Sequence, residues 1–145
     1  MKDLLYLKDD YLKEFIEKLF IGYRESFNDP KKILNKYSLG IAHHKAIHLI
    51  SLHQGITISQ LLGKLKVTKQ SLNRVLKDLI SLDAIQFKKG EKDTRLKHVF
   101  LSEKGEKLFD EIFSVQKKRI HKAFLNSTSK EVLFFDNVLK KIIHE

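Results

Sequence analysis

Two closely spaced helix signals, the first beginning at Thr57, constrain the fold of this chain more than any other feature. Thr57 and Gln60 have the spacing of a capping box, in which the threonine hydroxyl accepts from the Gln60 amide and the glutamine side chain reaches back to the Thr57 backbone. Residues 66 and 67 break the apolar periodicity, and Thr68 can cap a second helix. The sequence therefore predicts two short helices joined by a tight turn.

The second of these helices has one apolar face and one polar face. Its apolar residues recur at helical spacing and are Leu72, Val75, Leu76, Leu79 and Ile80. At about 100° per residue, the opposite face carries Gln70, Asn73, Arg74 and Lys77. Amide and guanidinium groups hydrogen-bond base edges and phosphates. The pair therefore has the pattern of a helix-turn-helix whose second helix enters the major groove of DNA.

A basic hairpin follows the second helix. Residues 84–87 and 96–101 have the pattern of two strands, and the loop between them is charged and contains Gly90. An arginine near the tip of such a hairpin, here Arg95, can enter the minor groove, where narrow A·T-rich DNA concentrates negative potential. The alternative is that Asp93 and Arg95 form an ordinary surface ion pair. We favour the role in DNA binding.

Two short motifs at the hairpin carry a family resemblance. Residues 93–95, Asp-Thr-Arg, have the pattern D-x-R. Residues 101–105 match L-T-x-x-G, with Ser102 in place of the threonine, a replacement that keeps the helix cap. From about residue 39 to residue 108 the chain resembles the MarR family of winged helix-turn-helix transcriptional regulators. The resemblance implies that Asp93 braces the guanidinium of Arg95, that the protein is a homodimer, and that it responds to a small-molecule effector of unknown identity.

A narrower resemblance rests on two other stretches. Residues 39–44, Leu-Gly-Ile-Ala-His-His, and residues 67–76 are similar to the alphaproteobacterial branch that contains the PetP-like and LdtR-like regulators.

Amphipathic helices are predicted at both ends of the chain. Between residues 10 and 26 the apolar stripe comprises Leu12, Phe15, Ile16, Leu19, Phe20 and Tyr23. After a capping box at Thr128 and Glu131, a second stripe comprises Val132, Leu133, Phe135, Val138, Leu139, Ile142 and Ile143. A winged region of about seventy residues is too small to cover both stripes. They either fold back on it or pair with a second subunit, and we favour a two-fold dimer with recognition helices one DNA turn, ~34 Å, apart.

The predicted fold is mainly α with a small β-hairpin wing, in the α+β class: a winged helix-turn-helix with N- and C-terminal dimerisation helices. It forms a single domain over residues 1–145, with a helical dimerisation region at about 1–38 and 103–145 and a DNA-binding region at about 39–102. Three further boundaries are predicted: Asp29 caps a short helix with Pro30 in its first turn, Gly55 closes a helix over residues 41–53, and Ser102 caps a long helix.

The charge of the chain points to an anionic partner. The net charge is +10, and residues 57–102 hold ten Lys or Arg against four Asp or Glu, which is 10 − 4 = +6 in about a third of the chain. A surface generally rich in lysine would not concentrate the positive charge on one helix face and the adjoining hairpin.

The absence of cysteine excludes disulfides and cysteine-oxidation sensing. No apolar run approaches the ~18–20 residues of a membrane span, so we expect no membrane association and a cytoplasmic location.

The histidines suggest a rival function. His44 and His48 are four residues apart on a predicted helix and can face one ligand, so a zinc-responsive regulator of the same fold is an alternative. No HExxH motif or complete ligand set supports it. We therefore assign no metal and expect His43 and His44 to cap or hydrogen-bond at a helix start.

No glycine-rich phosphate loop or G-x-S-x-G motif indicates an enzyme, and no cofactor is expected.

The sequence thus predicts a bacterial, homodimeric regulator that binds a pseudo-palindromic duplex in a sequence-specific way. A winged helix that binds a protein partner instead of DNA is the remaining alternative. The predicted DNA-binding residues are Thr68, Lys69, Gln70, Ser71, Asn73, Arg74, Lys77, Lys88, Lys89, Lys92, Asp93 and Arg95.

Overall fold

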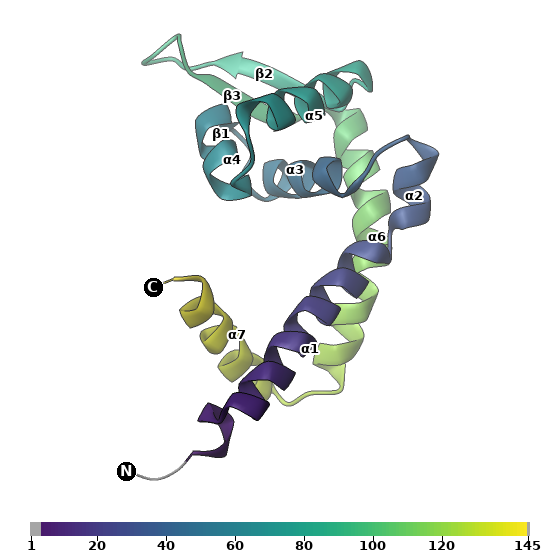
Figure 1. Ribbon diagram of the computed structural model, residues 1–145. Coiled ribbons are helices and arrows are strands. Elements are labelled where there is room, and N and C mark those ends of the chain that lie inside the picture. Colours follow the sequence, from purple (N-terminus) through teal and green to yellow (C-terminus); the bar gives the residue numbers. More distant parts are fainter. Residues whose placement is uncertain (1–3, 145) are drawn as a thin grey trace. The chain divides into compact units, whose positions relative to one another are not determined.

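The computed structural model describes residues 4–144, which divide into two compact units (Figure 1). One unit contains the residues up to Asp29 together with those from Val115 onward, and the other is Pro30–Ser114. The chain is mainly helical, with one small antiparallel sheet, as predicted. None of the helices described is both long and apolar enough to cross a membrane.

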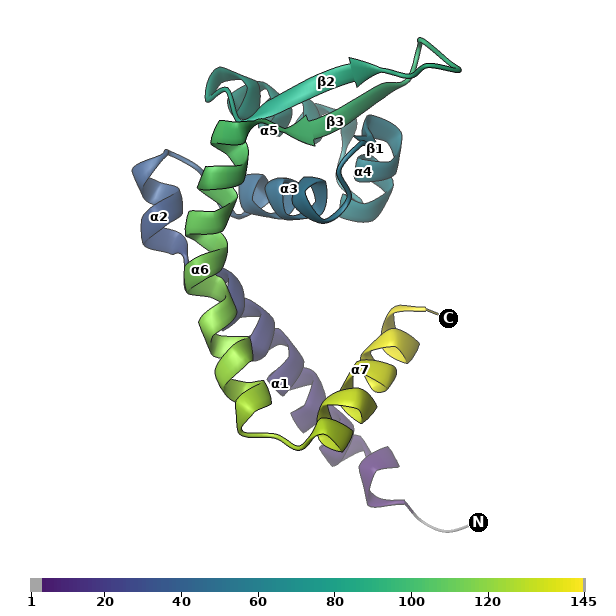
Figure 2. The same cartoon turned by 180° about the vertical axis from the view of Figure 1, so that it is seen from behind.

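The Pro30–Ser114 unit contains the predicted winged helix-turn-helix. Its elements are α2 (Lys31–Lys36), α3 (Ile41–Leu52), β1 (Ile56–Thr57), α4 (Ile58–Leu65), α5 (Lys69–Ser81), β2 (Ile85–Lys89), β3 (Lys97–Leu101) and the first half of α6 (Glu103–Leu125). The strands pair antiparallel in the order β1-β3-β2, with Val99 between Ile56 and Phe87. Figure 2 shows the β2–β3 hairpin extending past the helices of this unit.

Both predicted helix starts are confirmed. The Gln60 N–H donates to Thr57 Oγ1 at 3.1 Å, and the Thr57 N–H donates to Gln60 Oε1 at 3.0 Å. Thr68 Oγ1 accepts from the Ser71 N–H at 3.1 Å. Between the two helices Lys66 adopts a left-handed conformation with φ of 52°, which turns the chain sharply. These contacts lie within a few residues of one another, so local sequence is sufficient to specify them.

A single apolar core holds this unit together. Its fully buried side chains come from α3, α4, α5, β3 and α6 and include Ile47, Ile50, Leu61, Leu72, Leu79, Val99 and Ile112. One predicted member is wrong: Ile80 is 50% exposed. On α5 it lies about 100° from Leu79, on the flank of the buried arc.

The start of α6 is joined closely to the turn before β2. Ser102 Oγ accepts from the Gly105 N–H at 2.9 Å, which confirms the predicted cap, and donates to the Asp83 carbonyl at 2.6 Å. A Cβ on Gly105 would lie 1.9 Å from the Ala84 carbonyl oxygen. The motif at residues 101–105 therefore combines a helix cap with a position where only glycine fits.

The structure corrects several predicted boundaries. Helix α3 ends at Leu52, and Gly55 does not close it but lies at φ +89° and donates its N–H to Val99, leading into β1. Strand β1 was not predicted, because its two residues are too few to produce an alternating pattern. Strands β2 and β3 are shifted from the predicted 84–87 and 96–101 because pairing between them sets their ends.

The other unit contains η1 (Leu5–Leu7), α1 (Asp9–Asn28), the second half of α6, and α7 (Ser129–Ile143). The predicted box at Thr128 is confirmed: its N–H donates to Glu131 Oε1 at 3.0 Å, and its Oγ1 accepts from the Glu131 N–H at 3.2 Å. The predicted cap of α2 by Asp29 is wrong, and Pro30 occupies the cap position instead. The Asp29 carboxylate accepts from Arg119 Nε and NH2 at 2.7 and 2.9 Å.

Neither α1 nor α7 has a buried residue. Large apolar side chains on both helices remain open to solvent, and Ile16 is 60% exposed and Phe134 64% exposed. The predicted apolar stripes are present, but this chain alone does not cover them.

Candidate nucleic-acid interface

The outer face of α5 presents the predicted polar side chains to solvent. Leu72, Val75, Leu76 and Leu79 are buried beneath it. The seven predicted side chains on or next to this face are all exposed: Thr68, Lys69, Gln70, Ser71, Asn73, Arg74 and Lys77. Within residues 4–144 no acidic side chain lies within ion-pair distance of Lys69, Arg74 or Lys77. Their charges are therefore available to an anion.

The N-terminus of α5 adds backbone donors to this face. The Thr68 hydroxyl donates to Ser71 Oγ at 2.9 Å and accepts from the Ser71 N–H. The N–H groups of Lys69 and Gln70 lie in the first helical turn, where no helix carbonyl can accept from them. A phosphate placed here would meet these N–H groups and the Ser71 hydroxyl, while the Thr68 proton is used within the cap.

The wing holds Arg95 in a fixed relation to Asp93. The Arg95 N–H and Nε donate to Asp93 Oδ1 at 3.0 and 3.1 Å, and NH2 lies 3.4 Å from Oδ2. The Arg95 side chain, followed by its backbone N–H, holds the pKa of Asp93 below its ordinary value. Asp93 thus holds one edge of the guanidinium, while the Arg95 side chain remains 90% exposed. The predicted pairing is confirmed.

Two lysines of the hairpin lie near aromatic rings. Lys88 Nζ lies 4.8 Å from the centre of the Phe100 ring, and Lys97 Nζ lies 6.0 Å from the centre of the Phe87 ring. Lys89 and Lys92 are exposed near the tip. Lys97 was missing from the predicted set; it shares a strand face with the buried Val99 and Leu101, so the alternating pattern did not mark it as exposed.

The two histidines considered for metal binding, His44 and His48, lie within helix α3. His44 is completely buried, and the His48 ring meets Phe109 edge-on, with 5.6 Å between ring centres. Burial, followed by the charge of His53, lowers the pKa of His48. Over the described part of the chain, no three His, Cys, Asp or Glu side chains come together as a metal-binding group.

His43 fulfils the predicted role at the start of α3. Its Nδ1 accepts from the Gly40 N–H at 3.0 Å. Its Nε2 lies 2.8 Å from Asp78 Oδ2, a contact with α5 that sequence reasoning missed.

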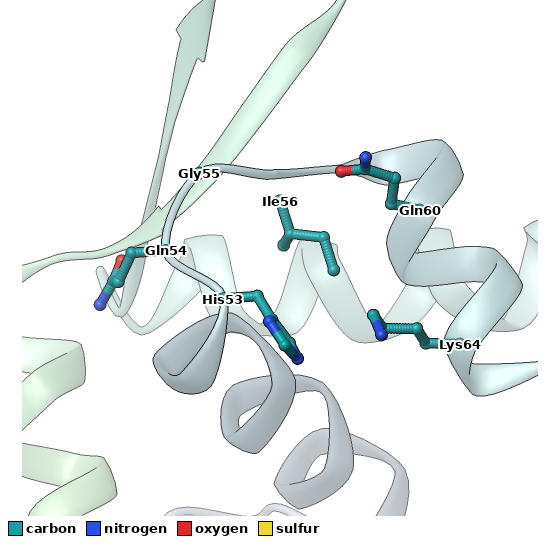
Figure 3. Close-up of a pocket in the computed structure, with 6 residues that line it drawn as sticks. All are labelled: His53, Gln54, Gly55, Ile56, Gln60 and Lys64. Carbon is teal, nitrogen blue, oxygen red and sulfur yellow. The ribbon is translucent and has the colours of Figure 1, made fainter. Parts of the chain in front are cut away.

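An open pocket of about 420 Å³ lies where α3, β1 and α4 meet (Figure 3). Figure 3 shows His53 and Lys64 directed into the same space, with Ile56 between them. Two polar groups of its lining are engaged, since Gln60 Oε1 accepts from Thr57 and Gln54 Oε1 accepts from the Leu101 N–H. None of the predicted DNA-binding side chains lines it.

Comparison with known proteins identifies the family. No family model matches the chain. It is 39% identical over 140 residues to the HTH-type transcriptional regulator PetP of Rhodobacter capsulatus, and the match covers 97% of this chain and 84% of PetP. The chain belongs to the MarR family of winged helix-turn-helix transcriptional regulators. The predicted family resemblance is confirmed, and the similarity to PetP agrees with the narrower branch.

Solved MarR structures share the fold of this MarR-family protein. Staphylococcus aureus MarR in complex with salicylate and kanamycin superposes with a TM-score of 0.72 at 22% identity, covering 92% of this chain and 91% of that one. A mutant of E. coli MarR complexed with operator DNA superposes with a TM-score of 0.66 at 20% identity, covering 97% and 99%. These similarities establish the winged helix-turn-helix architecture.

Proposed function

We propose that this MarR-family protein is a homodimeric, sequence-specific DNA-binding transcriptional regulator that acts on a pseudo-palindromic operator. The observation that carries the proposal is the outer face of α5, where amide and cationic side chains are exposed above a buried apolar face. Exposed Gln, Asn and Arg on one helix are the side chains that read base edges in the major groove. The E. coli MarR complex with operator DNA supports this reading of the shared fold.

The predicted residues divide into three groups by chemistry. Gln70, Asn73 and Arg74 read bases, because their planar groups form paired hydrogen bonds. Thr68, Lys69, Ser71 and Lys77 position α5 on the phosphates. On the wing, Arg95 braced by Asp93 enters the minor groove, while Lys88, Lys89 and Lys92 attract the DNA backbone.

We infer that a second copy of the chain covers the exposed apolar stripes of α1 and α7. A groove of about 580 Å³ in this unit is lined largely by apolar side chains from α1, α6 and α7, including Phe15, Leu19, Ile120 and Phe135. Exposed apolar surface on this scale marks an association site. We also propose that about 1–38 and 103–145 form the dimerisation region and about 39–102 the DNA-binding region of one domain.

We also propose that a small molecule controls the regulator, as the complex of S. aureus MarR with salicylate and kanamycin suggests for the fold. Its identity is unassigned. We propose that the protein is located in the bacterial cytoplasm, because its proposed ligand is chromosomal DNA. Zinc response through His44 and His48 and a protein-binding winged helix are the competing functions. Added zinc changes DNA affinity only in the first, and DNA binding is absent in the second.

The test is selection of bound fragments from random duplex DNA, followed by titration of the selected duplex between ~50 and 200 mM salt. We expect a two-fold symmetric motif and a slope of log K against log salt of about −0.9 per neutralised phosphate. Lys69→Ala should reduce the slope by about one phosphate, whereas Lys13→Ala on α1 serves as the matched control and should not. A slope near zero for the unmodified protein contradicts the proposal.

A further inference from the structure

The imidazole of His43 connects two helices. His43 lies in the first turn of α3, where its Nδ1 accepts from the Gly40 N–H at 3.0 Å. On the other side of the ring, Nε2 lies 2.8 Å from Oδ2 of Asp78 on α5. The His43 side chain is only 16% exposed, whereas that of Asp78 is 52% exposed. The histidine is thus held in place, and the carboxylate is on the accessible flank of α5.

The first hydrogen bond determines the direction of the second. A nitrogen that accepts from a backbone N–H carries no proton, so the neutral His43 ring holds its proton on Nε2. Nε2–H therefore donates to Asp78. One side chain both caps α3 and engages a carboxylate of α5.

That carboxylate is next to a base-reading residue. Asp78 follows Arg74 by four positions on α5, and residues at this spacing are neighbours on a helix surface. An unengaged aspartate there would pair with the guanidinium of Arg74 and draw it along the helix. In this structure Asp78 is bonded to His43, and no ion pair involves Arg74 within residues 4–144.

We propose that His43 is a positioning residue for DNA recognition: it holds the carboxylate of Asp78 on the flank of α5 and leaves the guanidinium of Arg74 free to read a base. The inference rests on the proposed function. It adds a residue from outside the helix-turn-helix to the determinants of base choice. The effect passes through Asp78, the residue of α5 to which His43 is hydrogen-bonded.

The experiment measures discrimination: affinity for the duplex selected by the unmodified protein, divided by affinity for the duplex changed at the base pair where Arg74→Ala loses its preference. His43→Asn keeps an acceptor for the Gly40 N–H but is too short to reach Asp78. It should lower discrimination about twofold, the scale of one competing i,i+4 ion pair. His43→Gln can still donate to Asp78 and should discriminate as the unmodified protein does. His53→Asn, at the other end of α3, is the matched control and should change nothing.

A double variant separates the proposal from a purely structural link. If the released carboxylate captures Arg74, adding Asp78→Ala to His43→Asn should restore most of the discrimination. A structural link would instead shift the unfolding temperature and lower the affinity for both duplexes together, and the double variant would remain as poor as His43→Asn. Either that result or a His43→Asn variant that discriminates normally overturns the inference. Absence of salt-dependent binding by the unmodified protein rejects the proposed function and this inference with it.

Discussion

Arg74 and Arg95 are both exposed, but their surroundings differ. The guanidinium of Arg95 on the wing is held along one edge by Asp93, while Arg74 on α5 has no acidic partner in the described chain. A braced arginine loses less side-chain entropy when it inserts into a groove. An unpaired one can form a bidentate contact with guanine. The two side chains are therefore suited to different tasks.

Alanine variants should separate these tasks. Arg95→Ala should weaken binding to most duplexes together, with the largest loss where flanking A·T tracts narrow the minor groove. Arg74→Ala should cost roughly 1–3 kcal/mol on the selected duplex and relax preference at particular base pairs. Asp93→Ala is the intermediate case, because it frees the guanidinium without removing it. The measurement is a titration of each variant against the selected duplex, its single-base changes and its flank-swapped forms; wild-type binding by Arg95→Ala would leave the wing without a role in DNA binding.

At the scale of elements, the start of α6 depends on close contact with the turn before β2. A Cβ at Gly105 would lie 1.9 Å from a backbone oxygen, so Gly105→Ala forces the backbone to move. We expect a loss of unfolding free energy of about 1–3 kcal/mol or more, as for other overpacked sites. Chemical denaturation followed by circular dichroism measures it.

Gly63 provides a control of opposite sign. It lies in the interior of α4, and a Cβ there meets no atom within 4 Å. Gly63→Ala should raise the unfolding free energy by up to about 1 kcal/mol, because alanine favours the helix. Equal effects of the two substitutions would contradict the role assigned to Gly105.

At the scale of the whole molecule, the exposed stripe of α1 predicts self-association. Replacing Ile16 and Phe20 with Gln should weaken the dimer, because two side chains that are 60% and 55% exposed in one chain would lose apolar contacts with a second copy. Glu14→Gln with Glu17→Gln on the same helix is the control and should leave association intact. Sedimentation over a range of concentrations gives the result, and unchanged sedimentation of the apolar double variant would place the interface elsewhere.

Local pattern was sufficient for much of this fold. The caps at Thr57, Thr68, Ser102 and Thr128 join residues three positions apart, and the buried face of α5 follows from helical period alone. The bracing of Arg95 by Asp93 spans two residues. Such features depend on backbone geometry that a short segment adopts by itself, so residue types at fixed spacing predict them.

Packing between distant segments decided the remainder. Strand β1 is defined by its pairing with β3, and Ile80 is half exposed although its spacing on α5 placed it with the buried residues. The Asp29 carboxylate accepts from Arg119, ninety positions away, and does not cap α2. His43 meets Asp78 across thirty-five positions. A polar side chain can hydrogen-bond only to a group that the folded chain brings within reach. For residues far apart in the sequence, that distance depends on tertiary packing and cannot be predicted from their spacing.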